Sequence, residues 1–283
     1  MIVVVDQNMM RSDDLRILVA THADCCFVIP DAALEEMVKH DKWEPTMRGS
    51  FQILAPALDR VFVSAGIGEL LRFERDERRA VSVEEILPGD LTVAARELVG
   101  AVLQGGQPLA AVRDNVESSR LEVSAERPSG DFLKARMLDS VSRLKSINGV
   151  ELTAEIRSAR ISGDARLGLL KLLTKALIEE FAGFDSDEQC LVEPWRLTTT
   201  RLIRATLWYH EHWLAEGGLH SAAPATVAND AFDMDYAITA SFFDDLLTKD
   251  RRAARCAADL RVIASPNAEA RLFQATRDYL NGR

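Results

Sequence analysis

Two short apolar stretches, far apart in the chain, each lead directly to an acidic residue. Ile2–Val5 is followed by Asp6, and Leu246-Leu247 leads through Thr248 to Asp250. An unbroken apolar run is typical of a strand that is buried on both faces of a parallel sheet. In open α/β sheets, ligands bind at the carboxyl ends of the strands. The two stretches therefore predict that two aspartates lie at the same ligand-binding edge of a sheet.

Strand and helix signals alternate at both ends of the chain. Further strands are predicted at 24–29, 60–64 and 260–263, and helices at 13–22, from Pro30 onward, at 236–243 and at 251–258. Ser12 or Asp13 suits the cap of the first helix, and Pro30 suits a first helical turn. We expect Asn229, Asp230, Asp233 and Asp235 at the start of the helix at 236–243, where carboxylates suit the helix dipole. This alternation predicts an α/β fold with a mainly parallel sheet.

The middle of the chain has a different character. From about residue 67 to 220, strand signals nearly vanish, and helices are predicted near 91–104, 131–147, 150–159, 164–182 and 197–215. Insertions enter a domain at exposed loops, where the two chain ends lie close together. We therefore expect one discontinuous α/β domain made of residues 1–66 and 221–283, interrupted by an all-helical insertion at 67–220.

Four motifs occur in order along the two ends of the chain. They are Val3-Val4-Val5-Asp6-Gln7-Asn8, Ile29-Pro30-Asp31-Ala32-Ala33-Leu34-Glu35-Glu36-Met37, Asp233-x-Asp235 and Leu247-Thr248-Lys249-Asp250. Together they resemble the PIN domain, a family of metal-dependent nucleases with a compact α/β fold, of which many cut RNA. The resemblance covers about residues 1–65 and 226–283, and it implies a PIN-like three-layer fold for them.

The resemblance also implies a set of metal ligands. Carboxylates that converge repel one another until Mg²⁺ or Mn²⁺, which prefer oxygen ligands, neutralises them. The expected ligands and catalytic residues are Asp6, Glu36, Asp233, Asp235 and Asp250, with Asn8 and Thr248 orienting carboxylates or water. A two-metal site would activate a water and stabilise the leaving oxygen of a phosphodiester.

Four of these assignments have alternatives. Asp6 could instead cap the helix that follows it. Glu35 and Glu36 differ by ~100° on a helix, so only one faces the site, and the family pattern favours Glu36. Asp233 and Asp235 both fit the third acid, and Asp230 is a weaker candidate. Thr248 and Asp250 could instead form a turn or a helix cap.

The expected function is that of an endoribonuclease that cuts single-stranded RNA with Mg²⁺ or Mn²⁺. Such proteins resemble toxins of toxin-antitoxin systems or defence effectors, which implies a protein regulator of the antitoxin kind. One alternative is a catalytically silent PIN-like scaffold that binds a protein partner through its helical block. Another is a PIN-related DNA nuclease, although the basic DNA-binding motif of that class is not found. A homo-oligomer is one further alternative for the assembly of the protein.

Composition, charge and residue spacing exclude several other kinds of protein and site. The net charge of −10 argues against a broad basic surface for nucleic acid, but not against a metal-dependent nuclease. No apolar run approaches the ~18 residues of a membrane span, and no signal peptide is recognised, so we expect a cytoplasmic protein without membrane contact. His210 and His212 lie ~200° apart on a helix and cannot share a metal.

Overall fold

The computed structural model describes residues 1–38, 41–111, 113–114, 116–117, 128–144, 146–147, 150–151 and 197–264. The helix expected at 164–182 lies outside these residues, as does the helix expected at 150–159 from residue 152 onward. Residues 150 and 151 form a short strand, β5 (Val150–Glu151), instead of the expected helix start. It pairs in antiparallel fashion with β4 (Ser146–Ile147).

The chain divides into two compact units. The sheet unit consists of Met1–Leu70, Val81–Arg127 and Asp235–Ala257. The helical unit consists of Leu71–Ala80, Pro128–Met234 and Ala258–Arg283. The boundaries fall within three helices, α4 (Ile67–Glu77), α13 (Pro224–Ala240) and α14 (Arg251–Ala264). Residues 81–127 belong to the sheet unit, and the insertion expected over 67–220 stays a prediction.

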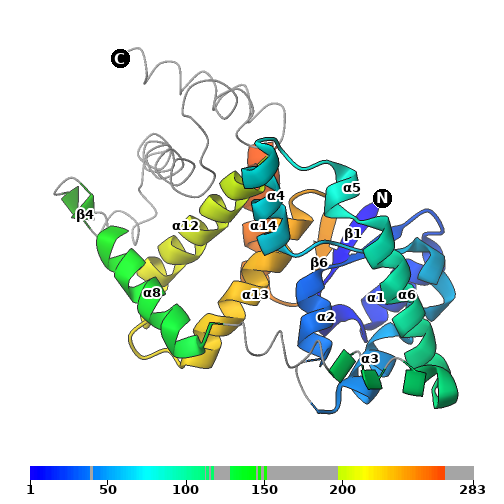
Figure 1. The fold of residues 1–283 in the computed structure, drawn as a ribbon. Helices are drawn as coiled ribbons and strands as arrows, with labels where there is room; N and C mark the ends of the chain where they lie inside the picture. Colours follow the sequence, from blue (N-terminus) through cyan, green and yellow to red (C-terminus); the bar gives the residue numbers. More distant parts are fainter. Residues whose placement is uncertain are drawn as a thin grey trace. The chain divides into compact units, whose positions relative to one another are not determined.

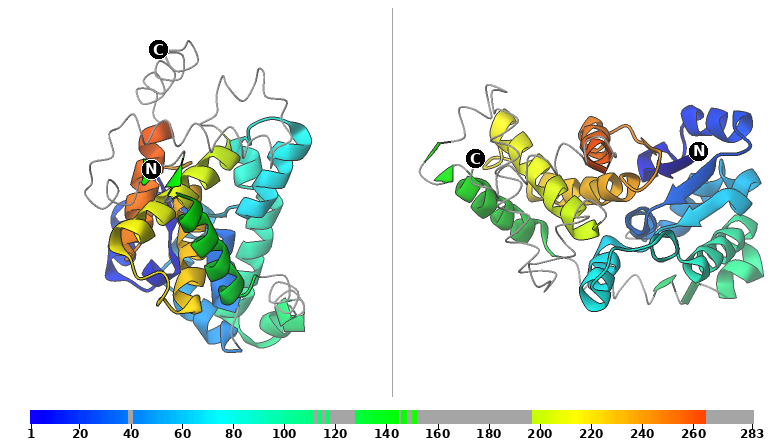
Figure 2. Two further views of the ribbon diagram at one scale, coloured as in Figure 1. Left: turned by 90° about the vertical axis from the view of Figure 1, so that its left-hand side faces the viewer. Right: turned by 90° about the horizontal axis from the view of Figure 1, so that it is seen from above.

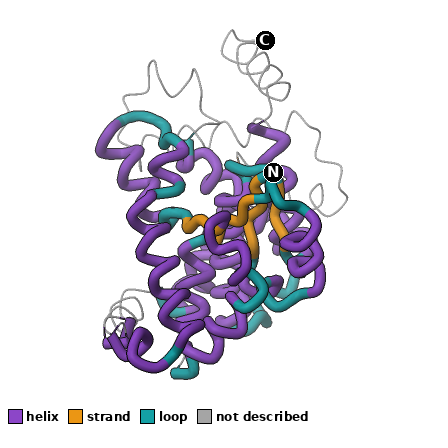
Figure 3. Tube along the Cα trace, turned by 90° about the vertical axis from the view of Figure 1, so that its right-hand side faces the viewer, coloured by secondary structure: helices purple, strands orange, loops and turns teal. Residues whose placement is uncertain are grey.

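Four parallel strands form the sheet, in the order β3-β2-β1-β6 (Figure 1). They are β1 (Ile2–Val5), β2 (Cys26–Ile29), β3 (Val61–Val63) and β6 (Asp245–Leu247). Val4 of β1 pairs with Val28 on one side and with Leu246 on the other. The strands lie next to one another, drawn in orange in Figure 3. This arrangement confirms the α/β class and the parallel sheet.

The apolar strand sequences explain why this sheet lies in the core. Val4, Val5, Phe27 and Val28 are fully buried, as expected when both faces of a parallel sheet are covered. The covering elements of the sheet unit are η1 (Gln7–Met9), α1 (Asp13–Thr21), α2 (Asp31–Val38), α3 (Trp43–Phe51), η2 (Ala55–Arg60), α5 (Val83–Ile86) and α6 (Gly89–Gln104). Helix α6 packs against β3 and α3, and α3 packs against α2.

Several helix boundaries follow from local signals. Ser12 caps α1, because its hydroxyl accepts a hydrogen bond from the backbone N–H of Leu15 at 3.1 Å. Pro30 immediately precedes α2, and its carbonyl accepts the N–H of Ala33 at 2.8 Å. The helices expected near 91–104 and 197–215 are confirmed as α6 and α12 (Thr198–Glu216). The helix expected near 131–147 is confirmed as α8 (Gly130–Leu144), but its predicted end is wrong because residues 146 and 147 form β4.

The strand predicted at 260–263 is wrong, because this segment is the last turn of α14. Ala253, Cys256, Ala257 and Leu260 are buried, with the three- and four-residue spacing of one helix face. That spacing overrides the β-branched pair Val262-Ile263, which favours a strand only locally.

The helix start predicted after Asp235 is also wrong. Helix α13 begins at Pro224, a favoured residue for a first helical turn. Asp230, Asp233 and Asp235 therefore lie inside the helix and not at its positive end. The expected benefit from the helix dipole does not apply to them.

The helical unit has its own apolar core. Helices α8 and α12 lie side by side (Figure 2). The core consists of buried aliphatic residues: Val141, Leu197, Ile203, Leu207, Leu214, Leu219 and Val227. Gly130 lets α8 begin close to the backbone of Pro224, since an added Cβ would lie 2.9 Å from the Pro224 carbonyl oxygen. Among the described residues, no helix combines the length and apolar character that crossing a membrane requires.

Candidate functional site at the carboxyl edge of the sheet

The strand order places a switch point between β1 and β6. From β1 the chain moves to β2 and β3 on one side of the sheet, and it returns with β6 on the other side. Ligands in open α/β sheets bind at such a point, beyond the carboxyl ends of the strands. The backbone N–H of Asp6, just after β1, donates to the carbonyl of Leu247, the last residue of β6, at 3.0 Å.

A hydrogen-bonded ring joins the ends of these two strands. The Asp6 carboxylate accepts from the backbone and side-chain N–H groups of Asn8 and from the Thr248 hydroxyl. In turn, the Asn8 side-chain oxygen accepts from the N–H of Lys249 at 3.2 Å. The Thr248 hydroxyl oxygen accepts from the N–H of Asp250 at 2.9 Å. The structure therefore brings Asp6, Asn8, Thr248 and Asp250 together, as the two strand ends predict.

Glu36 joins this group through a tyrosine. The Tyr236 hydroxyl, from α13, donates to the Glu36 carboxylate on α2 at 2.7 Å. The same hydroxyl accepts from the backbone N–H of Gln7, which follows Asp6, at 3.4 Å. Tyr236 is fully buried, whereas Glu36 is half-buried. Three elements of the sheet unit thus meet at one phenol oxygen.

The electrostatics of this edge are those of a buried acidic pair. Burial raises the pKa of Asp6, the hydrogen bonds from Thr248 and Asn8 oppose this rise, and the negative charge of Glu36 adds to it. Burial also raises the pKa of Tyr236, and the charges of Glu36 and Asp6 raise it further. Asp6, Glu36 and Tyr236 therefore interact electrostatically, and the phenol keeps its proton.

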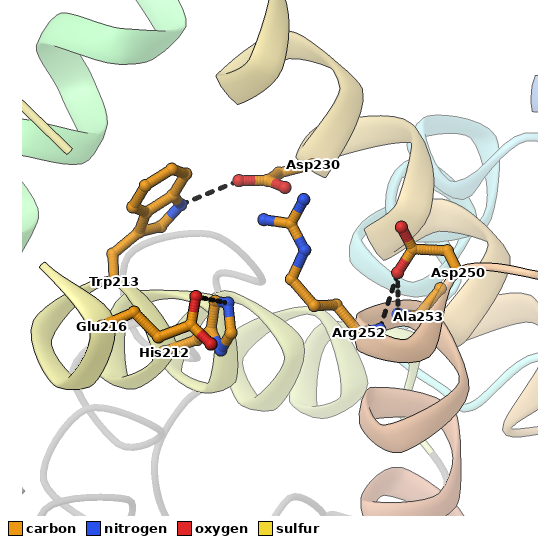
Figure 4. Close-up of polar contacts among 7 residues, drawn as sticks. All are labelled: His212, Trp213, Glu216, Asp230, Asp250, Arg252 and Ala253. Atoms are coloured by element: carbon orange, nitrogen blue, oxygen red, sulfur yellow. Dashed lines mark hydrogen bonds and ion pairs between the residues drawn. The ribbon is translucent and has the colours of Figure 1, made fainter. Parts of the chain in front are cut away.

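Asp250 has a clear structural role at the start of α14. One of its carboxylate oxygens accepts from the backbone N–H groups of Arg252 at 2.6 Å and Ala253 at 3.0 Å (Figure 4). This is the helix cap that the sequence left as an alternative. Its carboxylate is half-buried, and a role as a metal ligand stays a prediction.

The remaining acids are divided between the two units. Asp235 and Glu35 belong to the sheet unit and are half-buried, whereas Asp233 belongs to the helical unit. Asp233 and Asp235 are ~200° apart around α13, so they cannot both face one site. Asp230, also in the helical unit, is buried and accepts a hydrogen bond from the indole of Trp213 at 2.8 Å (Figure 4).

The ligand chemistry of this edge fits one hard cation better than a cage of four acids. Asp6 and Glu36 offer carboxylate oxygens, which Mg²⁺ and Mn²⁺ prefer. Within the described part of the chain, no three His, Cys, Asp or Glu side chains are grouped so that they could hold a metal ion. Mg²⁺ is commonly held by one or two carboxylates and completes its shell with water and substrate phosphates. Asp6 and Glu36 fit that pattern.

Tyr236 is the residue that sequence reasoning missed. Position 236 is expected only as the first residue of the helix at 236–243, directly after Asp235. A buried tyrosine hydroxyl needs a hydrogen-bond partner, so a tyrosine within an apolar helix that faces a cluster of acids is a usable signal. Its partners lie 200 and 229 residues away, which no local pattern reveals.

The site is thus described by its geometry alone. Comparisons of this chain with models of protein families, with curated proteins and with solved structures find no match.

Proposed function

We propose that the sheet unit is a PIN-like nuclease domain that binds a divalent cation at Asp6 and Glu36 and hydrolyses single-stranded RNA. One observation supports this most strongly. Asp6 is buried at the switch point of the sheet, and the Tyr236 hydroxyl joins a second acid, Glu36, to Gln7, the residue that follows Asp6. A buried pair of like charges is unfavourable, and such pairs are concentrated at functional sites.

A cation would relieve this repulsion. Asp6 and Glu36 would hold Mg²⁺ or Mn²⁺, whose charge would supply polarisation of a phosphoryl oxygen and easier ionisation of a water. Asn8 and Thr248 hold the Asp6 carboxylate in one orientation through their hydrogen bonds. Asp233 or Asp235 would supply a further acid from α13. Asp250 would contribute through the carboxylate oxygen that does not cap α14.

The RNA substrate and the biological role follow from the PIN resemblance. We propose single-stranded RNA because many members of that family cut RNA. A toxin or a defence effector of this kind would be restrained by a protein regulator.

The direct test is cleavage of labelled single-stranded RNA and DNA by the wild type and by Asp6→Asn, with Mg²⁺, Mn²⁺ or EDTA. Asp13→Asn is the matched control, because the Asp13 side chain is 91% exposed and belongs to the same unit. The proposal expects metal-dependent cutting of RNA by the wild type and by Asp13→Asn, and none by Asp6→Asn. Cutting that persists in Asp6→Asn, or in EDTA, would contradict it. Cutting of DNA alone would favour the DNA nuclease.

A second candidate is the silent scaffold, which binds a protein partner without cutting nucleic acid. It is favoured by the helix-capping role of Asp250 and by the absence of a three-acid group among the described residues. The scaffold predicts that the wild type takes up no Mn²⁺ and cuts neither RNA nor DNA. Mn²⁺ uptake that depends on Asp6 would exclude it.

A further inference from the structure

We propose that Tyr236 is a positioning residue that holds the Glu36 carboxylate toward Asp6, ready to take up the cation. The inference rests on the proposed function and deepens it, because it assigns a role at the same site to a residue outside the expected set of ligands and catalytic residues. Its basis is the pair of hydrogen bonds at the Tyr236 hydroxyl.

The phenol oxygen connects two segments that must meet if a shared cation is to bind. The hydroxyl donates to Glu36 at 2.7 Å, and it accepts from the N–H of Gln7 at 3.4 Å. Gln7 directly follows Asp6 and begins η1, so its N–H is fixed by the backbone at the end of β1. Glu36 sits on α2, where its flexible side chain has many rotamers. Tyr236 thus ties the movable acid to the fixed strand end.

The direction of the hydroxyl proton is determined by its surroundings. Burial and the two nearby acids keep the phenol protonated. The Gln7 N–H points at the phenol oxygen, which accepts its hydrogen bond. The hydroxyl is therefore left to donate its own hydrogen to another acceptor. The proton therefore goes to Glu36, and the resulting hydrogen bond to a charged group is a strong one.

The hydrogen bond from Tyr236 to Glu36 also acts against repulsion between the two acids. Asp6 and Glu36 are both acids, and two carboxylates that are brought near each other repel while no cation is present. Glu36 is half-buried, and its long side chain has several rotamers. The Tyr236 hydroxyl holds the side chain in one of them and thereby preorganises the pair for a cation.

The test is a titration of Mn²⁺ by calorimetry into the wild type, Tyr236→Phe, Glu36→Gln and the double variant. Loss of a group that orients a metal ligand typically weakens metal binding by about 10–100-fold. We expect a loss of that size in Tyr236→Phe. We expect no additional loss when Tyr236→Phe is added to Glu36→Gln, because the tyrosine acts through the glutamate. Tyr209→Phe is the control, since Tyr209 is equally buried but belongs to the helical unit.

The outcomes separate the inference from the proposed function. If the wild type takes up no Mn²⁺, the proposed function is overturned and the inference with it. If the wild type binds Mn²⁺ and Tyr236→Phe binds it equally well, only the inference is overturned. An added loss in the double variant equal to that of Tyr236→Phe alone would show a purely structural role and also overturn it.

A second variant keeps the inference testable if Tyr236→Phe does not fold. Glu36→Asp keeps the charge but shortens the side chain by one methylene, which withdraws the carboxylate from the Tyr236 hydroxyl. We expect Mn²⁺ binding to weaken at least tenfold. Binding by Glu36→Asp that equals that of the wild type would overturn the positioning role.

Discussion

Asp6 in the sheet unit and Glu74 in the helical unit are both buried carboxyl groups, and burial is the main cause that raises the pKa of each. The charges of the groups that surround the two carboxyls differ in sign. Glu74, on α4, accepts from the first backbone N–H groups of α12, those of Thr198 and Thr199, and from the Thr199 hydroxyl. A helix N-terminus carries partial positive charge, so these partners stabilise the carboxylate.

The charged neighbour of Glu74 is a cationic side chain, Arg201, whereas the charged neighbour of Asp6 is an acid, Glu36. Burial lowers the pKa of Arg201 to about 10, and the negative charge of Glu74 counteracts that fall. Glu36 is instead the charged neighbour of Asp6, and it raises the Asp6 pKa further. Burial alone therefore does not distinguish a structural acid from a functional one. The charge of its neighbours does: Glu74 lies near a cationic side chain, whereas Asp6 lies near an acid, which is why we propose a cation site at Asp6 and not at Glu74.

The largest expected effect comes from removing Glu74. Glu74→Ala leaves the N–H groups of Thr198 and Thr199 without their acceptor and removes the negative charge that faces Arg201. We expect the free energy of unfolding to fall by about 4 kcal/mol. Urea denaturation checks this, with Glu77→Ala, an exposed residue of the same helix, as control. Equal stability of the two variants would contradict a structural role for Glu74.

The pH dependence of stability tests another buried ionisable group of α12, the imidazole of His210. Burial lowers the pKa of His210 from 6.5 to about 4. The folded state then binds fewer protons than the unfolded state between these values, so stability is lost as pH falls from 6.5 through 4. The loss from this group reaches at most about 3 kcal/mol.

Denaturation of the wild type and of His210→Gln at a series of pH values measures this term. The difference in free energy of unfolding between the two should change over that pH range and be constant above it. His22→Gln, at an exposed histidine, should follow the wild type throughout. A constant difference for His210→Gln would show that the buried imidazole does not titrate as expected.

Two threonines allow the most closely matched comparison. Thr248 donates its hydroxyl to Asp6, and Thr199 donates its hydroxyl to Glu74. Each Thr→Val change should reduce the free energy of unfolding by about 1 kcal/mol. Only Thr248→Val should also weaken Mn²⁺ binding, by about tenfold. Calorimetry and urea denaturation on both variants check this, and equal Mn²⁺ affinity in the two would remove the distinction between the sites.

The sequence predicted the sheet well because buried parallel strands have continuous apolar sequences. All four strands were located, and the meeting of Asp6 with Thr248 followed from the two strand ends. The start of α13 was missed because three aspartates and an asparagine suggested a dipole-stabilised start, whereas Pro224 sets the true one. Val262-Ile263 suggested a strand because β-branched residues favour strands, but a buried helix face overrides that preference.

Long-range partners account for what no pattern could predict. Glu74 accepts from a residue 124 positions away and reads in the sequence as an ordinary surface glutamate of an amphipathic helix. Tyr236 reaches Glu36 across 200 positions. Local propensities contain no information about such contacts, which are created only when the helices pack.

Mn²⁺ binding by the wild type, Asp6→Asn and Asp13→Asn, measured by calorimetry at neutral pH, tests the central claim most directly. The account predicts one ion bound by the wild type and by Asp13→Asn, and none by Asp6→Asn with its fold intact. Mn²⁺ uptake by Asp6→Asn that equals that of the wild type would contradict the claim that this sheet edge is a cation site.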